Sequence, residues 1–168
     1  DVVSGGTSGH ICDAGTDAAG DNERDSVAGD SGSAKFDRAG RLDTITSIAT
    51  DIGGNDTIDT GGARDVVIGG QGSDTINTES GDDIVLGDSG SVTFNTDLDI
   101  CVDPADYGIL RTITTITPAI GDADTITTDE GADIVIGGAA NDSITAVAGD
   151  DVVLGTRRFA QFTACGML

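Results

Sequence analysis

Aspartate recurs every nine residues along two stretches of the chain. An aliphatic residue stands two positions after each of these aspartates, as Ile58 follows Asp56 and Val67 follows Asp65. A fixed period of this kind indicates a repeat architecture, in which every unit contributes one strand and one turn. The recurring aspartates are Asp56, Asp65, Asp74 and Asp83, followed by Asp124, Asp133, Asp142 and Asp151.

The composition indicates that the acidic side chains lie in turns. The 168 residues include 26 glycines and 30 acidic residues, almost all of them aspartate, and the formal net charge is -22. Aspartate and glycine favour turns, whereas glutamate suits helices. Short carboxylates in glycine-rich turns are oxygen ligands for a hard cation, and Ca2+ is the best candidate. A halophilic or merely soluble acidic surface is the alternative, but such a surface would not require a nine-residue register.

The charge also excludes two classes of partner. With only 8 basic residues, the chain lacks the Lys/Arg surface that nucleic-acid phosphates require. An acidic protein is equally repelled by anionic membrane surfaces. No apolar run reaches the ~18 residues of a membrane-spanning helix, so membrane insertion is not predicted.

The cysteines and the single histidine carry weaker signals. Cys12, Cys101 and Cys165 are an odd number without a CxxC spacing, so a disulfide framework is not expected, although one bridge remains compatible with the sequence. His10 stands where other repeats place aspartate, and it is better explained as a lost calcium ligand than as a transition-metal site. The sequence contains no catalytic constellation with supporting context, so we do not expect an enzyme.

The nine-residue period also predicts the fold. Nine residues accommodate a three-residue strand and a six-residue turn, but they are too few for a strand and a helix. Two such half-turns make one coil of 18 residues. The predicted fold is therefore all-β: a parallel β-roll, or β-solenoid, in which two sheets face each other across a thin core.

A second, longer repeat divides the chain into modules. Residues 42–58 align without a gap on residues 110–126, and GDSGSAKF at 29–36 returns as GDSGSVTF at 87–94. The predicted divisions are a truncated first module at 1–36, a second module at 37–94 with an insert at 37–52 and repeats at 53–94, a third module at 95–162 with an insert at 95–120 and repeats at 121–162, and a tail at 163–168.

Alternate half-turns should present different outer faces, because residues beside an inward side chain point outward. One predicted sheet has an apolar outer face and needs a cover, at Val66, Ile68, Ile84 and Leu86. We expect the insert strands 42–48 and 110–116 to supply this cover, and a neighbouring protein chain is the alternative. At the module ends we expect three aromatic plugs for the apolar stacks, Phe36, Phe94 and Phe162.

The other predicted sheet has a polar outer face. It presents a ladder of threonines with polar neighbours, namely Thr57, Thr75 and Thr93 beside Asp59, Asn77 and Asn95. A regular threonine array could bind ice or polysaccharide. Threonine also favours strands for its β-branched shape alone.

One segment matches a known repeat in full. Residues 69–77, GGQGSDTIN, fit the nonapeptide GGxGxDxUx, in which U is apolar. The chain thereby resembles the RTX (repeats-in-toxin) calcium-binding family, tightly over 53–94 and 121–162 and loosely over 1–36. The resemblance implies a parallel β-roll that binds Ca2+.

Each ion is expected between turns of successive coils on one edge, where stacked loops can supply the oxygens that calcium needs. The expected carboxylate pairs are Asp56 with Asp74, Asp65 with Asp83, Asp124 with Asp142 and Asp133 with Asp151, and Asp25 is a further expected ligand. Backbone carbonyls are expected near Gly54, Gly70, Gly72, Gly81, Gly131, Gly138 and Gly149. The turns ending at Val92 and Ala160 lack the aspartate, so we expect the calcium ladders to end there.

The predicted function is structural. We expect a calcium-folded segment of a secreted or cell-surface protein, adhesin-like or forming a filament or layer. The resemblance implies that low cytosolic calcium keeps the segment unfolded before export. Open solenoid ends and an apolar outer face would allow a homo-oligomer or filament. The alternative function is an ice- or polysaccharide-binding surface that uses the threonine ladder.

Overall fold

The computed structural model describes residues 2–6, 9, 11–13, 24–95, 109–156 and 159–161. All regular structure in these residues is β-strand. None of them belongs to a helix that could cross a membrane. The strands form two parallel sheets and one antiparallel sheet, which confirms the predicted all-β class.

Two parallel sheets form the roll. The central sheet has the order β1-β3-β7-β9-β13-β15, and the outer sheet has the order β14-β12-β8-β6-β2. The chain alternates between the two sheets, so one strand from each makes a coil of the predicted β-roll. The central strands are β1 (Val2–Gly6), β3 (Ser26–Asp30), β7 (Val66–Gly70), β9 (Ile84–Asp88), β13 (Ile134–Gly138) and β15 (Val152–Thr156). The outer strands are β2 (Ile11–Asp13), β6 (Thr57–Asp59), β8 (Thr75–Asn77), β12 (Thr125–Glu130) and β14 (Ser143–Ala148).

Successive coils stack in the register of the repeat. Ile58 lies opposite Ile76, and Val67 lies opposite Val85. Each of these residues stands two positions after a repeat aspartate, and each is buried between the two sheets. The predicted inward position is therefore confirmed. This thin core consists of Val27, Ile58, Val67, Ile76, Val85, Ile126 and Val135, with Ile144 packed against it.

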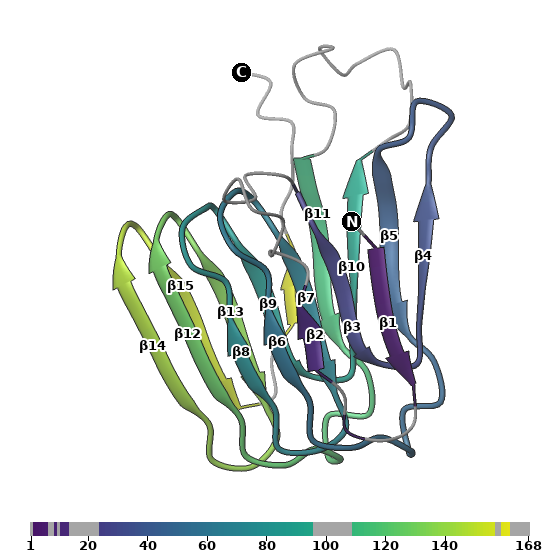
Figure 1. The fold of residues 1–168 in the computed structure, drawn as a ribbon, viewed down its shortest axis with the longest axis vertical. Helices are drawn as coiled ribbons and strands as arrows, with labels where there is room; N and C mark the ends of the chain where they lie inside the picture. Colours follow the sequence, from purple (N-terminus) through teal and green to yellow (C-terminus); the bar gives the residue numbers. More distant parts are fainter. Residues whose placement is uncertain are drawn as a thin grey trace.

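A third, antiparallel sheet covers the apolar face of the central sheet, and Figure 1 shows β4, β5, β10 and β11 gathered together beside the coils. Ile68, Leu86 and Ile136 of the central sheet share one buried cluster with Ile45 and Ile113 of this covering sheet. The expected intramolecular cover by segments 42–48 and 110–116 is confirmed. The covering strands are β4 (Gly32–Phe36), β5 (Leu42–Ser47), β10 (Gly90–Asn95), β11 (Ile109–Thr115) and β16 (Phe159–Gln161).

Two segments that were predicted to stay in the roll join the covering sheet instead. The chain leaves the roll after β3 and β9, and both β4 and β10 pair antiparallel with β5. Phe94 is buried in the covering cluster and Phe36 is 42% exposed, so the prediction that these rings plug the apolar stacks is wrong. The outer face of the central sheet needs apolar partners, and Val92 and Phe94 supply them. The predicted plug at Phe162 lies outside the described residues.

The polar ladder of the outer sheet differs from the predicted one, because β10 belongs to the covering sheet. Thr93 belongs to β10 of the covering sheet, so its predicted place in the ladder is wrong. Asn95 is also in β10. In the outer sheet, Thr75 lies opposite both Thr57 and Thr125. The exposed ladder therefore consists of Thr57, Thr75, Thr125 and Ser143.

The roll continues across the inserts. Strand β8 pairs with β12 and β9 pairs with β13, so the repeats before and after the second insert stack in one solenoid. Strand β7 continues the stack from β3 in the same way across the first insert. The covering strands are therefore excursions from a continuous coil, and each excursion leaves from the end of a central strand.

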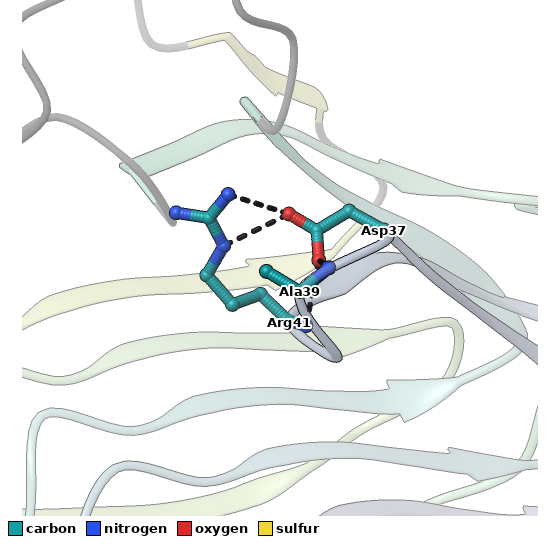
Figure 2. A network of polar contacts seen from close by, with 3 residues as sticks. All are labelled: Asp37, Ala39 and Arg41. Carbon is teal, nitrogen blue, oxygen red and sulfur yellow. Dashed lines mark hydrogen bonds and ion pairs between the residues drawn. The ribbon is translucent and has the colours of Figure 1, made fainter.

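The first excursion is closed by a tight polar turn between β4 and β5, shown in Figure 2. Asp37 Oδ1 accepts hydrogen bonds from the main-chain N–H groups of Ala39 and Arg41, at 2.8 and 2.9 Å. Its Oδ2 accepts from the Arg41 guanidinium at 2.8 Å (Nε) and 2.6 Å (Nη2). These hydrogen bonds from Arg41, main-chain first, hold the pKa of Asp37 below its ordinary value. The short insert thus forms a hairpin without a long loop.

The covering interface should be a major source of stability. Leu86 is fully buried in it, so replacing Leu86 with alanine should lower the free energy of unfolding of the calcium-loaded protein by about 2–5 kcal/mol. Urea denaturation followed by circular dichroism measures this change. Val147→Ala, at a side chain that is 61% exposed, is the control and should change stability by less than about 0.5 kcal/mol. Equal midpoints for the two variants would contradict the assignment of this core.

Candidate metal centre

The turns of the roll form two edges, and each edge carries a row of aspartates. One edge lies where central strands end and outer strands begin, and we call its aspartates the glycine row: Asp56, Asp74, Asp124 and Asp142. Asp74 and Asp142 follow central strands directly, and Asp56 and Asp124 are reached from the covering strands; the central strands end at this edge in a glycine that lies against each carboxylate, namely Gly29, Gly69, Gly87 and Gly137. Turns from the outer to the central sheet include three that begin with threonine, at Thr60, Thr78 and Thr128. We call the aspartates of this edge the threonine row: Asp25, Asp65, Asp83, Asp133 and Asp151.

Main-chain hydrogen bonds hold the carboxylates of the glycine row in line. The N–H of Asp56 donates to Oδ1 of Asp74 at 2.8 Å, and the N–H of Asp74 donates to Oδ1 of Asp124 at 2.9 Å. Asp124 donates in turn to Asp142 at 3.2 Å. The expected pairs Asp56–Asp74 and Asp124–Asp142 are brought together, and Asp74–Asp124 is an additional pair across the second insert.

The threonine row has the same pattern. The N–H of Asp65 donates to Oδ1 of Asp83 at 2.9 Å, and that of Asp133 donates to Asp151 at 3.1 Å, as the sequence pairs them. The inserts again do not interrupt the row, since Asp25 donates to Asp65 at 2.8 Å and Asp83 donates to Asp133 at 2.9 Å. Every predicted carboxylate therefore stands in one of two continuous ladders.

In six of these carboxylates the second oxygen lacks a hydrogen-bond partner. Among the described residues, Oδ2 is buried without a hydrogen bond in six row members, Asp65, Asp74, Asp83, Asp124, Asp133 and Asp142. A buried carboxylate oxygen without a partner carries a large desolvation cost. One such atom could be a local irregularity, but a repeated row of them indicates that these oxygens face a partner other than the main-chain N–H groups, such as a cation.

The glycine row forms an oxygen-lined cradle at the first residue of each turn. A Cβ atom on Gly69 would stand 2.5 Å from Oδ2 of Asp74 and closer still to the carbonyl oxygen of Gly87. A Cβ on Gly87 would stand 2.5 Å from the carbonyl oxygen of Gly137 and closer to Oδ2 of Asp124. Carboxylate and carbonyl oxygens of neighbouring coils therefore converge where glycine leaves room. This donor set fits calcium, which takes oxygen ligands at about 2.3–2.6 Å.

Three of the carbonyls named from the sequence, those of Gly54, Gly81 and Gly131, face glycines of a neighbouring coil. The carbonyl of Gly54 faces Gly72 of the next coil, and those of Gly81 and Gly131 face the next glycines in the same way. The carbonyls beside the carboxylates belong to Gly69, Gly87 and Gly137, which the sequence analysis did not single out. The available signal was the first glycine of the nonapeptide, which packs against the aspartate of its own turn.

Carboxylates alone do not complete a metal cage in this roll. In the part of the chain that the structure describes, no three His, Cys, Asp or Glu side chains are grouped closely enough to hold a metal ion. Successive row members belong to successive coils, so they are separated by about the spacing of neighbouring strands in a parallel sheet. Main-chain carbonyl oxygens must therefore supply the remaining ligands.

Two further aspartates enter the glycine row at the points where the chain leaves the roll. Asp30 and Asp88 are 5% and 4% exposed, and Asp88 pairs with Gly70 across the central sheet. Asp30 accepts hydrogen bonds from the N–H of Gln71 at 2.6 Å and of Gly54 at 3.2 Å, and Asp88 accepts from Ala139. They fasten each interrupted turn to the next coil. The repeated GDSG at 29–32 and 87–90 was the sequence signal for them.

Burial raises the pKa of three glycine-row carboxylates, Asp74, Asp124 and Asp142, and of the adjoining Asp88. The pKa of Asp74 and of Asp88 rises to about 7 and that of Asp124 to about 8, first because burial disfavours the charged form. Neighbouring carboxylates add to the rise: Asp74, Asp88 and Asp142 all repel the charge of Asp124. Main-chain hydrogen bonds oppose the rise without cancelling it. The edge thus concentrates negative charge in a poorly solvated place.

Two carboxylates of the threonine row, Asp65 and Asp83, are affected in the same direction. Burial raises the pKa of Asp65 to about 6 and that of Asp83 to about 7. The hydroxyls of Thr60 and Thr78 lie close enough to these carboxylates to oppose the rise, yet neither hydroxyl completes a hydrogen bond of normal geometry.

The side chains of the cysteines and of the histidine are outside the part of the chain that the structure describes. Cys12 lies in β2, opposite Ile58, and its side chain is not among the described ones. His10, Cys101 and Cys165 lie outside the described residues. Their roles therefore stay as the sequence predicts them.

Comparison with known proteins agrees with this geometry. The family model of the RTX calcium-binding nonapeptide repeat, which spans 4 copies, matches residues 53–76, 59–94 and 119–155. Neither the curated proteins nor the solved structures gave a match. The matched segments contain eight of the aspartates that form the two rows, from Asp56 to Asp151. The repeat segments of this chain therefore belong to the RTX calcium-binding nonapeptide repeat family, and their ligand is Ca2+.

Proposed function

We propose that this chain is a calcium-rigidified structural segment of a secreted or cell-surface protein, adhesin-like or forming a filament or layer. The observation that carries the proposal is the row of buried carboxylate oxygens without partners. A fold that stacks such groups needs a cation to be stable, and the repeat family supplies the identity of the cation.

The ligands that best fit calcium are those of the glycine row. Oδ2 of Asp74 and Asp124 stands beside the carbonyl oxygens of Gly87 and Gly137 from the following coil. Asp56 and Asp142 extend the same arrangement at either end, where their Oδ2 atoms lie against Gly29 and Gly137. The residues act by holding oxygens in place, and bound calcium would neutralise their charge.

This chemistry supports an extracellular location. Ligand-bearing turns form only when the coils stack, so calcium binding and folding are coupled. In the cytosol, where free calcium is scarce, the repelling carboxylates would keep the chain unfolded and competent for export. Outside the cell, calcium would complete the roll and stiffen it.

Calcium should therefore be required for folding. We expect circular dichroism to show β-structure with calcium and its loss in EDTA, because the uncompensated rows repel. Asp74→Asn should raise the calcium concentration at the folding midpoint at least about tenfold, since one charged ligand contributes on the order of 1.4 kcal/mol or more to binding. Asp51→Asn, which removes the same charge from an exposed turn, is the matched control and should leave the midpoint unchanged. Identical spectra with calcium and with EDTA would refute the proposal.

The stability of the roll in EDTA and its affinity for calcium should depend on pH in opposite directions. In EDTA, carboxylates with a raised pKa stabilise the fold while protonated, so stability should decrease as the pH rises from the ordinary value of 3.8 toward about 8, the pKa of Asp124. Calcium binding needs the ionised carboxylates, so calcium affinity should increase over the upper part of this interval. Circular dichroism across pH in EDTA follows the folded fraction from acid, where the carboxylates are protonated, to about pH 8, where it should be lost, and calcium titrations at each pH measure the affinity. Slopes of the same sign would contradict this account.

The last coil supports the filament variant of the proposal. Three valines of the edge strands are exposed: Val147 of β14 is 61% exposed, and Val152 and Val153 of β15 are 42% and 45% exposed. Unpaired strand edges with apolar side chains favour end-to-end association.

Association should accordingly depend on this end of the solenoid. With calcium, the sedimentation coefficient should increase with protein concentration, and Val153→Lys should abolish the increase because a charge then stands at the stacking surface. Ile48→Lys, at a side chain that is 51% exposed on the covering side, is the control and should associate like the wild type. A monomer at every concentration would exclude the filament variant.

A further inference from the structure

The two rows differ at the residue that begins each turn. In the glycine row this residue is Gly29, Gly69, Gly87 or Gly137, and a Cβ atom at each would crowd the oxygens of the turn. In the threonine row the same position holds Thr60, Thr78 and Thr128, each of them 0% exposed. A β-branched side chain therefore occupies the interior of one edge, where the other edge has none.

The threonine side chains take the volume that the glycine row leaves to a cation. A single Cβ on Gly69 would already stand 2.5 Å from Oδ2 of Asp74. Threonine adds a hydroxyl and a methyl group to that Cβ atom. Calcium needs six to eight oxygens around it, at about 2.3–2.6 Å, and a methyl group at this position displaces them.

The hydroxyls point to the same conclusion. Thr60 and Thr78 influence Asp65 and Asp83 closely enough to stabilise their charged forms. The three hydroxyl oxygens are buried without a hydrogen-bond partner among the described residues, as are the Oδ2 atoms of Asp65, Asp83 and Asp133. A small movement of each threonine side chain would let its hydroxyl donate a hydrogen bond to the Oδ2 atom of the neighbouring aspartate.

The charges of the two edges differ as well. Arg24 and Arg64 directly precede Asp25 and Asp65 of the threonine row. Arg64 interacts electrostatically with Asp82 and Asp83, and its guanidinium lies 5.6 Å from the centre of the Phe94 ring. The described turns of the glycine row contain no Lys or Arg, and they gain two buried carboxylates, Asp30 and Asp88. The threonine row does carry exposed acids, such as Glu79 and Asp82, but these face solvent.

We propose that calcium binds along the glycine row only, and that threonine side chains fill the corresponding position of the threonine row. This inference rests on the proposed function, because it requires that the roll binds calcium. The solenoid then has one edge held by ions and one edge held by hydroxyl–carboxylate contacts.

Counting bound ions tests the inference. Equilibrium dialysis at saturating calcium gives the number of ions per chain, and circular dichroism at the same calcium concentration verifies the fold. Asp74→Asn should lose at least one ion, whereas Asp83→Asn, the matched change in the other row, should bind as many ions as the wild type. A loss of ions in Asp83→Asn would overturn the inference.

A gain of ions provides the second test, which does not depend on how Asp83→Asn folds. Thr78→Gly opens the threonine-row position beside Asp83, so this variant should bind more calcium than the wild type. Thr78→Ser keeps a hydroxyl at that position and should show no gain. An unchanged number of ions in Thr78→Gly would overturn the inference. If the wild type binds no calcium at all, the proposed function itself fails, and the two failures are thereby distinguished.

Discussion

Electrostatic repulsion between stacked carboxylates governs this fold. Each coil places an aspartate directly over the aspartate of the coil before it, and in six of these carboxylates a main-chain N–H group binds one oxygen while the other is buried without a hydrogen bond. The spacing of strands in a sheet, about 4.8 Å, keeps these charges close. The core between the sheets is one aliphatic side chain deep on each side, so it offers little to oppose the repulsion. In the proposed function, calcium bound along the glycine row neutralises this charge and holds the coils together.

The inserts solve a different problem without disturbing the rows. The central sheet is apolar on both faces, and a solenoid alone would expose one of them. Each excursion into the covering sheet leaves from the end of a central strand and returns to the next turn, so the coil resumes in register. Asp30 and Asp88 connect the point of departure to the following coil through main-chain N–H groups. Cover and roll are thus joined at the edge that carries the glycine row.

Much of this could be predicted from the sequence because the repeat is local. The nine-residue period places Asp74 in a turn and Ile76 in the core, and stacking of identical units leaves one register that buries the aliphatic residues. The need for a cover, and the segments that supply it, followed from the apolar residues flanking Val67 and Val85. The positions of Phe94 and Thr93 could not be predicted, because an antiparallel excursion and a further half-turn of the roll share the same alternating pattern. The nine-residue period alone does not show whether such a segment packs in the thin core between the parallel sheets or on the outer face of the central sheet.

The sequence by itself determined the repeat, its coil length, the acidic turns and the identity of the cation, since all of these depend on neighbours within a few positions. Only the tertiary structure decided that the repeats on both sides of each insert form one solenoid, in which the N–H of Asp74 donates a hydrogen bond to Asp124, 50 residues away in the sequence. It also decided which carbonyls meet the carboxylates, and that one edge is lined by glycine while the other encloses threonine side chains. These features depend on which coil lies above which, and that contact is made through space rather than along the chain.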